Sequence, residues 1–263
     1  MAGKTALVTG ACINTGVAIV EKFASEGYNV VFTGRNKEKV IASQAEYRKK
    51  YPSVQIDGYV LESLDESGNV REEEVHEFFD MLDEKGIFVE CVVLNAADQG
   101  LNQKIFQNPL SDFMRVINTN VVWNYCLAEC AAKRMVTNGG GSITFINSNT
   151  AYRAIPDRIA YEASKGGQLG MMRGLAFDLG KYNIRVNAVL PGMIRTDRWT
   201  KNPDWYKTVP SAFTPLGDVA EGKDIADGVW YFAAHARNTT GAELVIDGGN
   251  SIQLYPIIPD KKD

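Results

Sequence analysis

Four polar residues of types that suit proton transfer at a carbonyl oxygen are Asn120, Ser148, Tyr161 and Lys165. Tyr161 and Lys165 are four residues apart in a helical pattern, which places them on one helix face, one turn apart. A tyrosine ionises at about pH 10, so it is a poor base at neutral pH on its own. A neighbouring ammonium stabilises the phenolate and lowers its pKa. The pair therefore predicts a general acid/base, with Tyr161 exchanging the proton.

Ser148 and Asn120 extend this group of residues. Ser148 lies just past the apolar run Ser142–Ile146, and side chains after a strand lie at the edge where open α/β sheets bind ligands. Its hydroxyl is suited to bind a substrate oxygen. Asn120, taken alone, equally suits an asparagine inside a helix that bonds to the backbone.

A glycine-bearing turn near the N-terminus predicts a phosphate site. The run Thr5–Val8 leads through Gly10, Asn14, Thr15 and Gly16 into a helical pattern. Backbone N–H groups in such a turn, together with the positive end of the helix, can bind a pyrophosphate. The alternative is an ordinary glycine-bearing turn between a strand and a helix.

Arg35 bears on the choice of cofactor. An acidic side chain at the end of the second strand would bind the ribose hydroxyls of NAD, but Gly34 stands there and Arg35 follows. A guanidinium can pair with a 2′-phosphate, which favours NADP(H) over NAD(H). Alternatively Arg35 stacks on adenine or faces solvent, and either cofactor then serves.

The elements that must position these residues alternate along the chain. Strand-like runs are separated by 21 to 53 residues, enough for crossover helices. They are Thr5–Val8, Val30–Phe32, Gln55–Leu61, Cys91–Leu94, Ser142–Ile146, Arg185–Val189 and Glu243–Ile246. We therefore expect an α/β fold with one Rossmann-like, doubly wound sheet of about seven parallel strands and helices on both faces.

The chain of 263 residues suits one domain over residues 1–263, with a substrate flap at about 193–223, where three prolines and two tryptophans interrupt the pattern. A net charge of −4 argues against nucleic-acid binding. No apolar run is long enough to span a membrane, and the start resembles no signal peptide, so we expect a cytoplasmic protein.

Cysteine and histidine usage predicts no metal site. Cys126 and Cys130 have helical spacing but no matching second pair, so buried thiols are favoured over ligands. His76 and His235 suit exposed or capping positions, which argues against a hydrolase triad.

Several motifs in order, from about Thr5 to Gly249, resemble the short-chain dehydrogenase/reductase family. The resemblance implies NAD(P)(H)-dependent hydride transfer between a ketone and a secondary alcohol. Tyr161 would exchange the proton, Ser148 would orient the oxygen, Lys165 would bind the nicotinamide ribose, and Asn120 would hold a water in a proton relay. The implied cofactor-binding residues are Gly10, Asn14, Thr15, Gly16, Arg35, Asn95, Ala96, Ala97, Tyr161, Lys165, Pro191, Gly192, Ile194 and Thr196.

Two positions depart from the family pattern. Asn14 and Ala97 stand where glycines are usual, and asparagine is among the residues that best tolerate a left-handed backbone. We therefore expect the turn to survive, with the Asn14 side chain close to the cofactor.

The substrate is left open by the sequence. Aromatic residues of the flap, together with residues that follow Ser148, favour a bulky apolar body, as in the bacterial hydroxysteroid dehydrogenases of this family. They are Trp199, Trp205, Tyr206 and Phe213, with Ala151, Tyr152, Ala154, Ile155 and Pro156. The alternative is that these aromatics pack the flap onto the body or onto another subunit.

Three other functions compete. 3-Oxoacyl-carrier-protein reduction would suit a basic entrance formed by Arg153, Arg158, Arg195 and Arg198, and sugar or polyol oxidation is also open. A nucleotide-sensing scaffold without turnover is the alternative from another class.

Two predicted helices carry apolar residues on more than one face. Together with the family resemblance, they predict a homotetramer. They carry Val121, Val122, Trp123, Leu169, Met171 and Met172.

Overall fold

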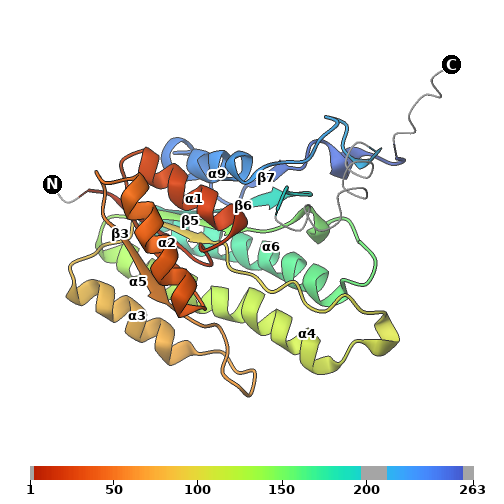
Figure 1. Cartoon of the computed structure of the whole chain (residues 1–263), viewed down its shortest axis with the longest axis horizontal. Helices are drawn as coiled ribbons and strands as arrows, with labels where there is room; N and C mark the ends of the chain where they lie inside the picture. Colours follow the sequence, from red (N-terminus) through yellow and green to blue (C-terminus); the bar gives the residue numbers. More distant parts are fainter. Residues whose placement is uncertain (1–2, 197–211, 257–263) are drawn as a thin grey trace.

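The centre of the molecule is a seven-stranded sheet with the order β3-β2-β1-β4-β5-β6-β7, in which all neighbours are parallel (Figure 1). The computed structural model describes residues 3–196 and 212–256, and every structural statement refers to these residues. The strands are β1 Thr5–Val8, β2 Asn29–Gly34, β3 Ile56–Val60, β4 Cys91–Leu94, β5 Gly141–Ile146, β6 Ile184–Pro191 and β7 Glu243–Ile246. The predicted parallel sheet is confirmed.

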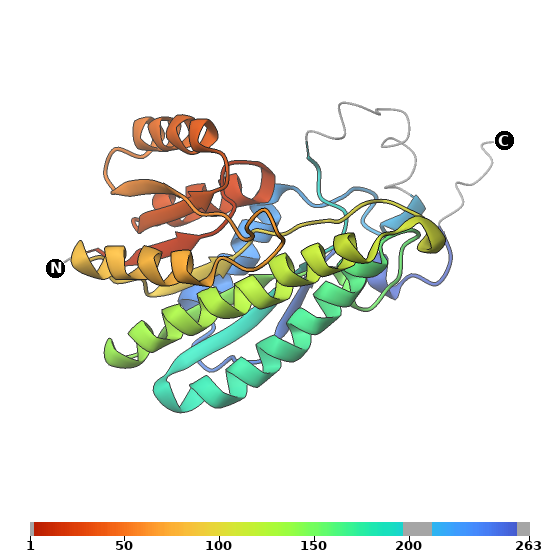
Figure 2. The same ribbon diagram turned by 90° about the horizontal axis from the view of Figure 1, so that it is seen from below.

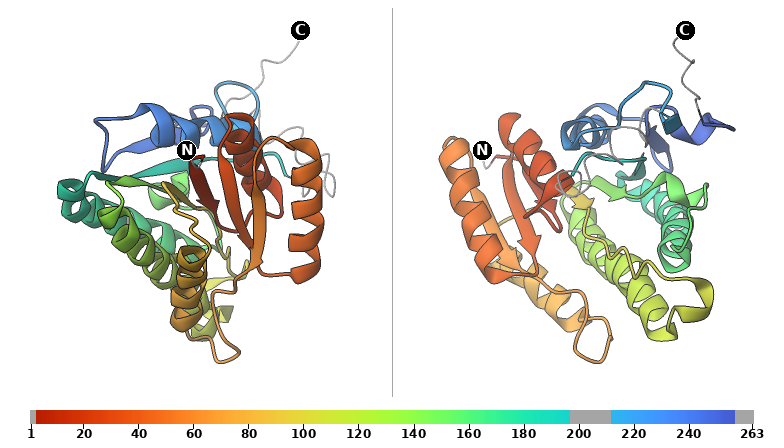
Figure 3. Two further views of the ribbon diagram at one scale, coloured as in Figure 1. Left: turned by 90° about the vertical axis from the view of Figure 1, so that its left-hand side faces the viewer. Right: turned by 45° about the vertical axis from the view of Figure 1, so that its right-hand side comes forward.

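Helices cover both faces of this sheet, as predicted (Figure 3). They are α1 Asn14–Ser25, α2 Lys37–Lys50, α3 Glu72–Glu84, α4 Leu110–Ile117, α5 Asn124–Thr137, α6 Ile159–Leu179 and α9 Gly222–Trp230. One apolar cluster joins α3, α5 and α6 to the sheet, through residues such as Leu127 and Leu169. A second cluster joins α1, α2 and α9 to the other face, through Ile19, Val40 and Val229. The sheet is thus buried on both sides, which explains its apolar, β-branched strands.

One long helical run crosses the face that carries α6. Helix α4 continues through the π-helical segment η2, Asn118–Trp123, into α5, and the run lies beside α6 in Figure 2. π-Helical turns are uncommon and occur often at functional sites. Here the wide turn contains Asn120, which is fully buried.

The carboxyl ends of all seven strands meet at one edge, because the strands are parallel. Strand β1 lies between β2 and β4, so the chain leaves the sheet centre in opposite directions on the two sides. Ligands of open α/β sheets bind at such a switch point. The turn after β1 and the loop after β4 therefore mark the expected cofactor cleft.

The predicted flap is described only at its two ends. Ile194 forms a parallel bridge with Ala220, and the Arg195 N–H donates to the Ala220 carbonyl at 2.8 Å. The two ends of the flap are thus held together beside β6. Trp199, Trp205 and Tyr206 lie outside the described residues, as does Arg198.

Candidate active site

Ser148 and Tyr161 meet at the carboxyl end of β5. Ser148 lies two residues beyond this strand, and its hydroxyl caps a short 3-10 turn by accepting a 3.2 Å hydrogen bond from the Thr150 N–H. A hydrogen bond also joins the Ser148 and Tyr161 side chains. Tyr161 stands in the first turn of α6, which brings its phenol to the same edge. The two hydroxyls are therefore close enough to bind one substrate oxygen together.

Lys165 follows Tyr161 one turn later, and only 1% of the residue is exposed to solvent. Its Nζ donates to the Ile146 carbonyl at 2.8 Å and to Gln168 Oε1 at 3.2 Å, and lies 5.5 Å from the centre of the Tyr161 ring. An ammonium has three N–H donors, so one is left for another partner. Burial lowers the pKa of Lys165 from 10.5 to about 7.

The electrostatics of Tyr161 differ from the sequence expectation. Burial raises the pKa of Tyr161, and the hydrogen bond with Ser148 and the charge of Arg158 offset only part of this rise. We expected Lys165 to lower the pKa of the phenol. Burial thus disfavours the charged form of both groups.

Asn120 is fixed by hydrogen bonds on every side. Its side-chain Oδ1 accepts from the Asp98 N–H at 2.7 Å, and its Nδ2 donates to the Asp98 carbonyl at 2.8 Å. The same Nδ2 donates to Ser164 Oγ at 2.9 Å, and that hydroxyl donates to the Tyr161 carbonyl at 2.7 Å. The Asn120 side chain thus joins the loop after β4 to the turn of α6 that carries Tyr161.

The turn after β1 has the geometry that a dinucleotide needs. Gly10 has a φ of +65°, and a Cβ on Gly16 would lie 2.6 Å from the Gly10 carbonyl oxygen, so only glycine fits there. Asn14 has a φ of 49°, which confirms that asparagine tolerates the left-handed backbone at this departure from the family pattern. Helix α1 begins after Ile13, which has no capping side chain. The first-turn N–H groups, including that of Thr15, are thus available to a phosphate.

The loop after β4 locks onto this turn. The Asn95 side-chain amide donates to the carbonyls of Thr9 and Gly10 at 2.9 and 3.1 Å, and the N–H groups of Asn95 and Ala96 donate to Thr9 Oγ1. These contacts fix the spacing between the two loops. Ala97, the second departure from the family pattern, is exposed beside them.

The end of β2 has no room for an acidic side chain at residue 34. A Cβ on Gly34 would lie 2.5 Å from Cys12 Sγ and 2.9 Å from Val40 Cγ2. Arg35 is exposed, and no carboxylate pairs with its guanidinium among residues 3–196 and 212–256. The cation is thus free to meet an anionic ligand at this end of the sheet.

The segment that begins at the end of β6 lies on the other side of the expected cleft. It contains Pro191, Gly192, Ile194 and Thr196. The Gly192 N–H donates to the Ile246 carbonyl at 3.0 Å, and a Cβ on Gly192 would lie 2.6 Å from the Asp247 side chain. The segment is therefore held tightly against β7 before it enters the flap.

The residues that sequence reasoning missed lie behind the catalytic group. Gln168 is buried between Lys165 and Asn120, and Asn147 Nδ2 donates to both Gln168 Oε1 and the Lys165 carbonyl, at 3.1 and 2.9 Å. A signal was present, because positions 161, 165 and 168 share one helix face. A glutamine on the buried face of α6 could have been recognised as part of the site.

Two interpretations of the expected entrance change with the structure. The Tyr152 hydroxyl bonds to Glu243 and Arg173, so it is held against β7 and α6. Arg195 makes two 2.7 Å contacts with Asp218, which neutralise its charge. The basic entrance is therefore weaker than the sequence alone indicates.

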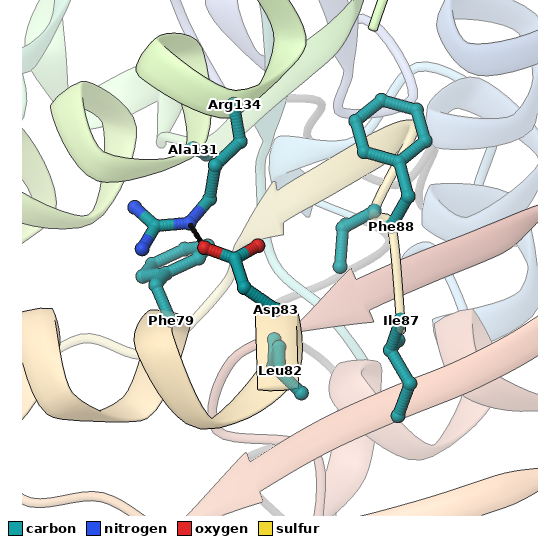
Figure 4. Close-up of a pocket in the computed structure, with 8 residues that line it drawn as sticks. Phe79, Leu82, Asp83, Ile87, Phe88, Ala131 and Arg134 are labelled. Carbon is teal, nitrogen blue, oxygen red and sulfur yellow. Dashed lines mark hydrogen bonds and ion pairs between the residues drawn. The ribbon is translucent and has the colours of Figure 1, made fainter. Parts of the chain in front are cut away.

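The hollow drawn in Figure 4 is a different feature. It lies between α3, α5 and the segment that leads into β4, at the amino end of the sheet, and its volume of about 10 Å³ corresponds to about one water molecule. Its size and position exclude it as the cofactor site.

The described ranges contain neither a metal-binding cluster nor a membrane-spanning helix. No group of three or more His, Cys, Asp or Glu side chains there could hold a metal ion. The side chain of His76 is 43% exposed, as expected, and its Nδ1 lies 3.3 Å from the thiol of Cys130. No helix among these residues is long and apolar enough to cross a bilayer.

A parallel sheet with a glycine turn at its switch point is typical of a dinucleotide-binding, Rossmann-like fold. A family model described as enoyl-(acyl carrier protein) reductase matches residues 10–251. The chain belongs to the short-chain dehydrogenase/reductase family and is one of its oxidoreductases.

Two curated relatives have different substrates. The chain is 32% identical over 248 residues to a 3α-hydroxysteroid dehydrogenase of Mediterraneibacter gnavus, covering 93% of this chain and 96% of the relative. It is also 32% identical over 260 residues to a glucose 1-dehydrogenase of Gluconobacter oxydans, covering 97% and 93%. These relatives support the family and leave the substrate open.

Solved structures agree with the fold and with a nicotinamide cofactor. ElxO with NADP bound has a TM-score of 0.85 and 28% identity, covering 95% of this chain and 100% of that one. A 7α-hydroxysteroid dehydrogenase with NADH and 7-oxo glycochenodeoxycholic acid has a TM-score of 0.83 and 29% identity, with 94% of each chain covered. The likeness extends over nearly the whole chain.

Proposed function

We propose that this chain interconverts a ketone and a secondary alcohol with a nicotinamide cofactor, using Tyr161 as the general acid/base. The observation that carries the proposal is the grouping of Ser148, Tyr161 and Lys165 at one sheet edge. Ser148 and Tyr161 share a hydrogen bond, and the Lys165 Nζ lies 5.5 Å from the Tyr161 ring. The glycine turn after β1 stands at the same edge.

Each polar side chain of the site has its own role in the reaction. Ser148 donates a hydrogen bond to the substrate oxygen and holds it beside Tyr161. In reduction the Tyr161 hydroxyl gives its proton to that oxygen, and in oxidation it takes the proton back. The free N–H of Lys165 binds a ribose hydroxyl of the cofactor, and its charge stabilises the phenolate. The nicotinamide supplies or accepts the hydride when bound.

NADP(H) is the cofactor that we favour. Cys12 and Val40 fill the space in which an acidic residue 34 would bind a ribose hydroxyl, and Arg35 offers an unpaired charge beside it. A guanidinium suits a 2′-phosphate. The likeness to ElxO with NADP bound supports this choice, and the likeness to a structure with NADH keeps NAD(H) as the alternative.

The substrate that we favour has a bulky apolar body, as in a hydroxysteroid. Leu101 and Ile155, on the loops that follow β4 and β5, expose apolar side chains, as Phe213 does at the end of the flap. The similarity to two hydroxysteroid dehydrogenases supports this class. The glucose 1-dehydrogenase similarity supports a sugar as the alternative. Arg153 and Arg158, which donate to the carbonyls of Ser251 and Gln99, suit a carrier protein.

A panel of ketones tests the proposal. Oxidation of NADPH and of NADH is followed with oxosteroids, a keto sugar and a 3-oxoacyl carrier-protein substrate. We expect turnover of at least one oxosteroid, with NADPH preferred. A kcat/KM at least about tenfold higher for the sugar or acyl ketone than for every oxosteroid would overturn the apolar substrate class. The reaction itself would be wrong if no ketone consumed either cofactor.

A homotetramer is the assembly that we propose. Large apolar side chains are exposed on the helical run and on α6, among them Val122, Tyr125 and Phe177. Exposed apolar surface of this kind is typical of a protein interface. The single domain over residues 1–263 and the cytoplasmic location stay predictions.

A further inference from the structure

Gln168 connects two residues of the candidate active site through its side-chain amide. Its Oε1 accepts from Lys165 Nζ at 3.2 Å, and its Nε2 donates to the Asn120 carbonyl at 2.6 Å. Asn147 Nδ2 donates to the same Oε1 at 3.1 Å. Oε1 thus meets two donors and Nε2 meets an acceptor, so the orientation of the amide is determined by its partners. Gln168 is 1% exposed.

Asn120 has little capacity left for a further partner. Its carbonyl accepts from Gln168 Nε2 and also from Asn124 Nδ2, at 2.9 Å, and a carbonyl oxygen has two lone pairs. Its side chain bonds to Asp98 and Ser164, and the residue is fully buried. The family resemblance implies a relay water held by Asn120. In this chain the Asn120 carbonyl is committed to protein donors.

We propose that Gln168 is a positioning residue that links Asn120 to Lys165 and holds the Lys165 ammonium in place. The inference rests on the proposed function for its catalytic meaning. Gln168 therefore fixes Nζ through its Oε1, while its Nε2 is held by the Asn120 carbonyl.

Few groups around Lys165 can stabilise its positive charge, so the contact with Gln168 is important. The titratable group beside Nζ is the Tyr161 phenol, and Arg158 adds a positive charge near that phenol. The end of β5 presents the Ile146 carbonyl and the Asn147 amide, and η2 presents Asn120 through Gln168. Within the described ranges no carboxylate pairs with Nζ. The ammonium thus depends on two neutral acceptors.

Two substitutions at Gln168 test this role in opposite directions. Gln168→Leu keeps the approximate size but removes the acceptor, whereas Gln168→Glu places a negative charge beside Nζ. Titration of Lys165 is followed by NMR of protein labelled at the lysine ε-carbon, and the signal is assigned with Lys165→Met. Gln44→Leu is the matched control, because the Gln44 Oε1 also accepts a hydrogen bond, from the Gly58 N–H at 2.6 Å, between α2 and β3.

We expect the pKa of Lys165 to fall by about one unit in Gln168→Leu and to rise by about one unit or more in Gln168→Glu. The pH profile of kcat/KM should move in the same directions, with Gln44→Leu unchanged. If Gln168→Leu does not fold, Gln168→Glu alone decides. An unchanged Lys165 titration would overturn the inference. Shifted titration with no turnover of any ketone supports the role of Gln168 while refuting the proposed function.

Discussion

Lys165 opposes folding at neutral pH, and the substitution Lys165→Met reveals by how much. Burial lowers the pKa of Lys165 to about 7 in the folded chain, against 10.5 for the ordinary side chain. Between these values the unfolded chain binds a proton that the folded chain has released. Stability therefore rises with pH in this window, and the cost of the buried charge is complete below it.

The size of the effect follows from the width of the window. Each pH unit between the two pKa values adds about 1.4 kcal/mol to the free energy of unfolding. From about pH 7 to about pH 9.5, the wild type should gain about 3 kcal/mol relative to Lys165→Met. Methionine keeps an unbranched apolar side chain of similar length, so the packing under β5 changes little.

The assay is urea unfolding of both proteins at the two pH values, without cofactor and at one protein concentration. The difference between the proteins cancels the titration of all other groups. A difference that stays constant within about 0.5 kcal/mol would show that Lys165 has an ordinary pKa in the folded chain, and the electrostatic reasoning would be wrong.

Three further predictions concern the cofactor turn and the assembly. Arg35→Ala should weaken NADPH binding by roughly 1.5–3 kcal/mol and leave NADH nearly unchanged, and equal losses in calorimetry would refute this. Gly16→Ala should lower Tm, because a Cβ at this position would clash with the backbone. Gly170→Ala, on α6, should raise the free energy of unfolding by about 0.5–1 kcal/mol, because a Cβ there meets open space. Light scattering at micromolar concentration should show a tetramer, and a monomer would contradict it.

The fold could be predicted because apolar runs and helix lengths leave few arrangements. Three strands begin and end where the sequence indicates, Thr5–Val8, Cys91–Leu94 and Glu243–Ile246. The ends of the remaining strands shift by at most two residues, because ladder hydrogen bonds and not composition decide where a strand ends. The π-helical turn at Asn118–Trp123 was not predicted, since it depends on buried side-chain bonds made with other elements.

The site was predictable where a single side chain carries the chemistry. Ser148, Tyr161 and Lys165 stand together, as their spacing indicates. The direction in which the pKa of Tyr161 shifts was not predictable, because burial in the folded chain decides it. Gln168 was missed because its contacts join α6 to η2 across 48 positions of the sequence.

The most direct test of the proposed mechanism is turnover by Tyr161→Phe with a ketone that the wild type reduces. The substitution removes one exchangeable proton and leaves the ring in place. We predict a loss in kcat of about 10²–10⁴-fold, with NADPH affinity and Tm nearly unchanged. A variant that keeps more than about a third of the wild-type kcat would contradict the assignment of Tyr161 as the general acid/base.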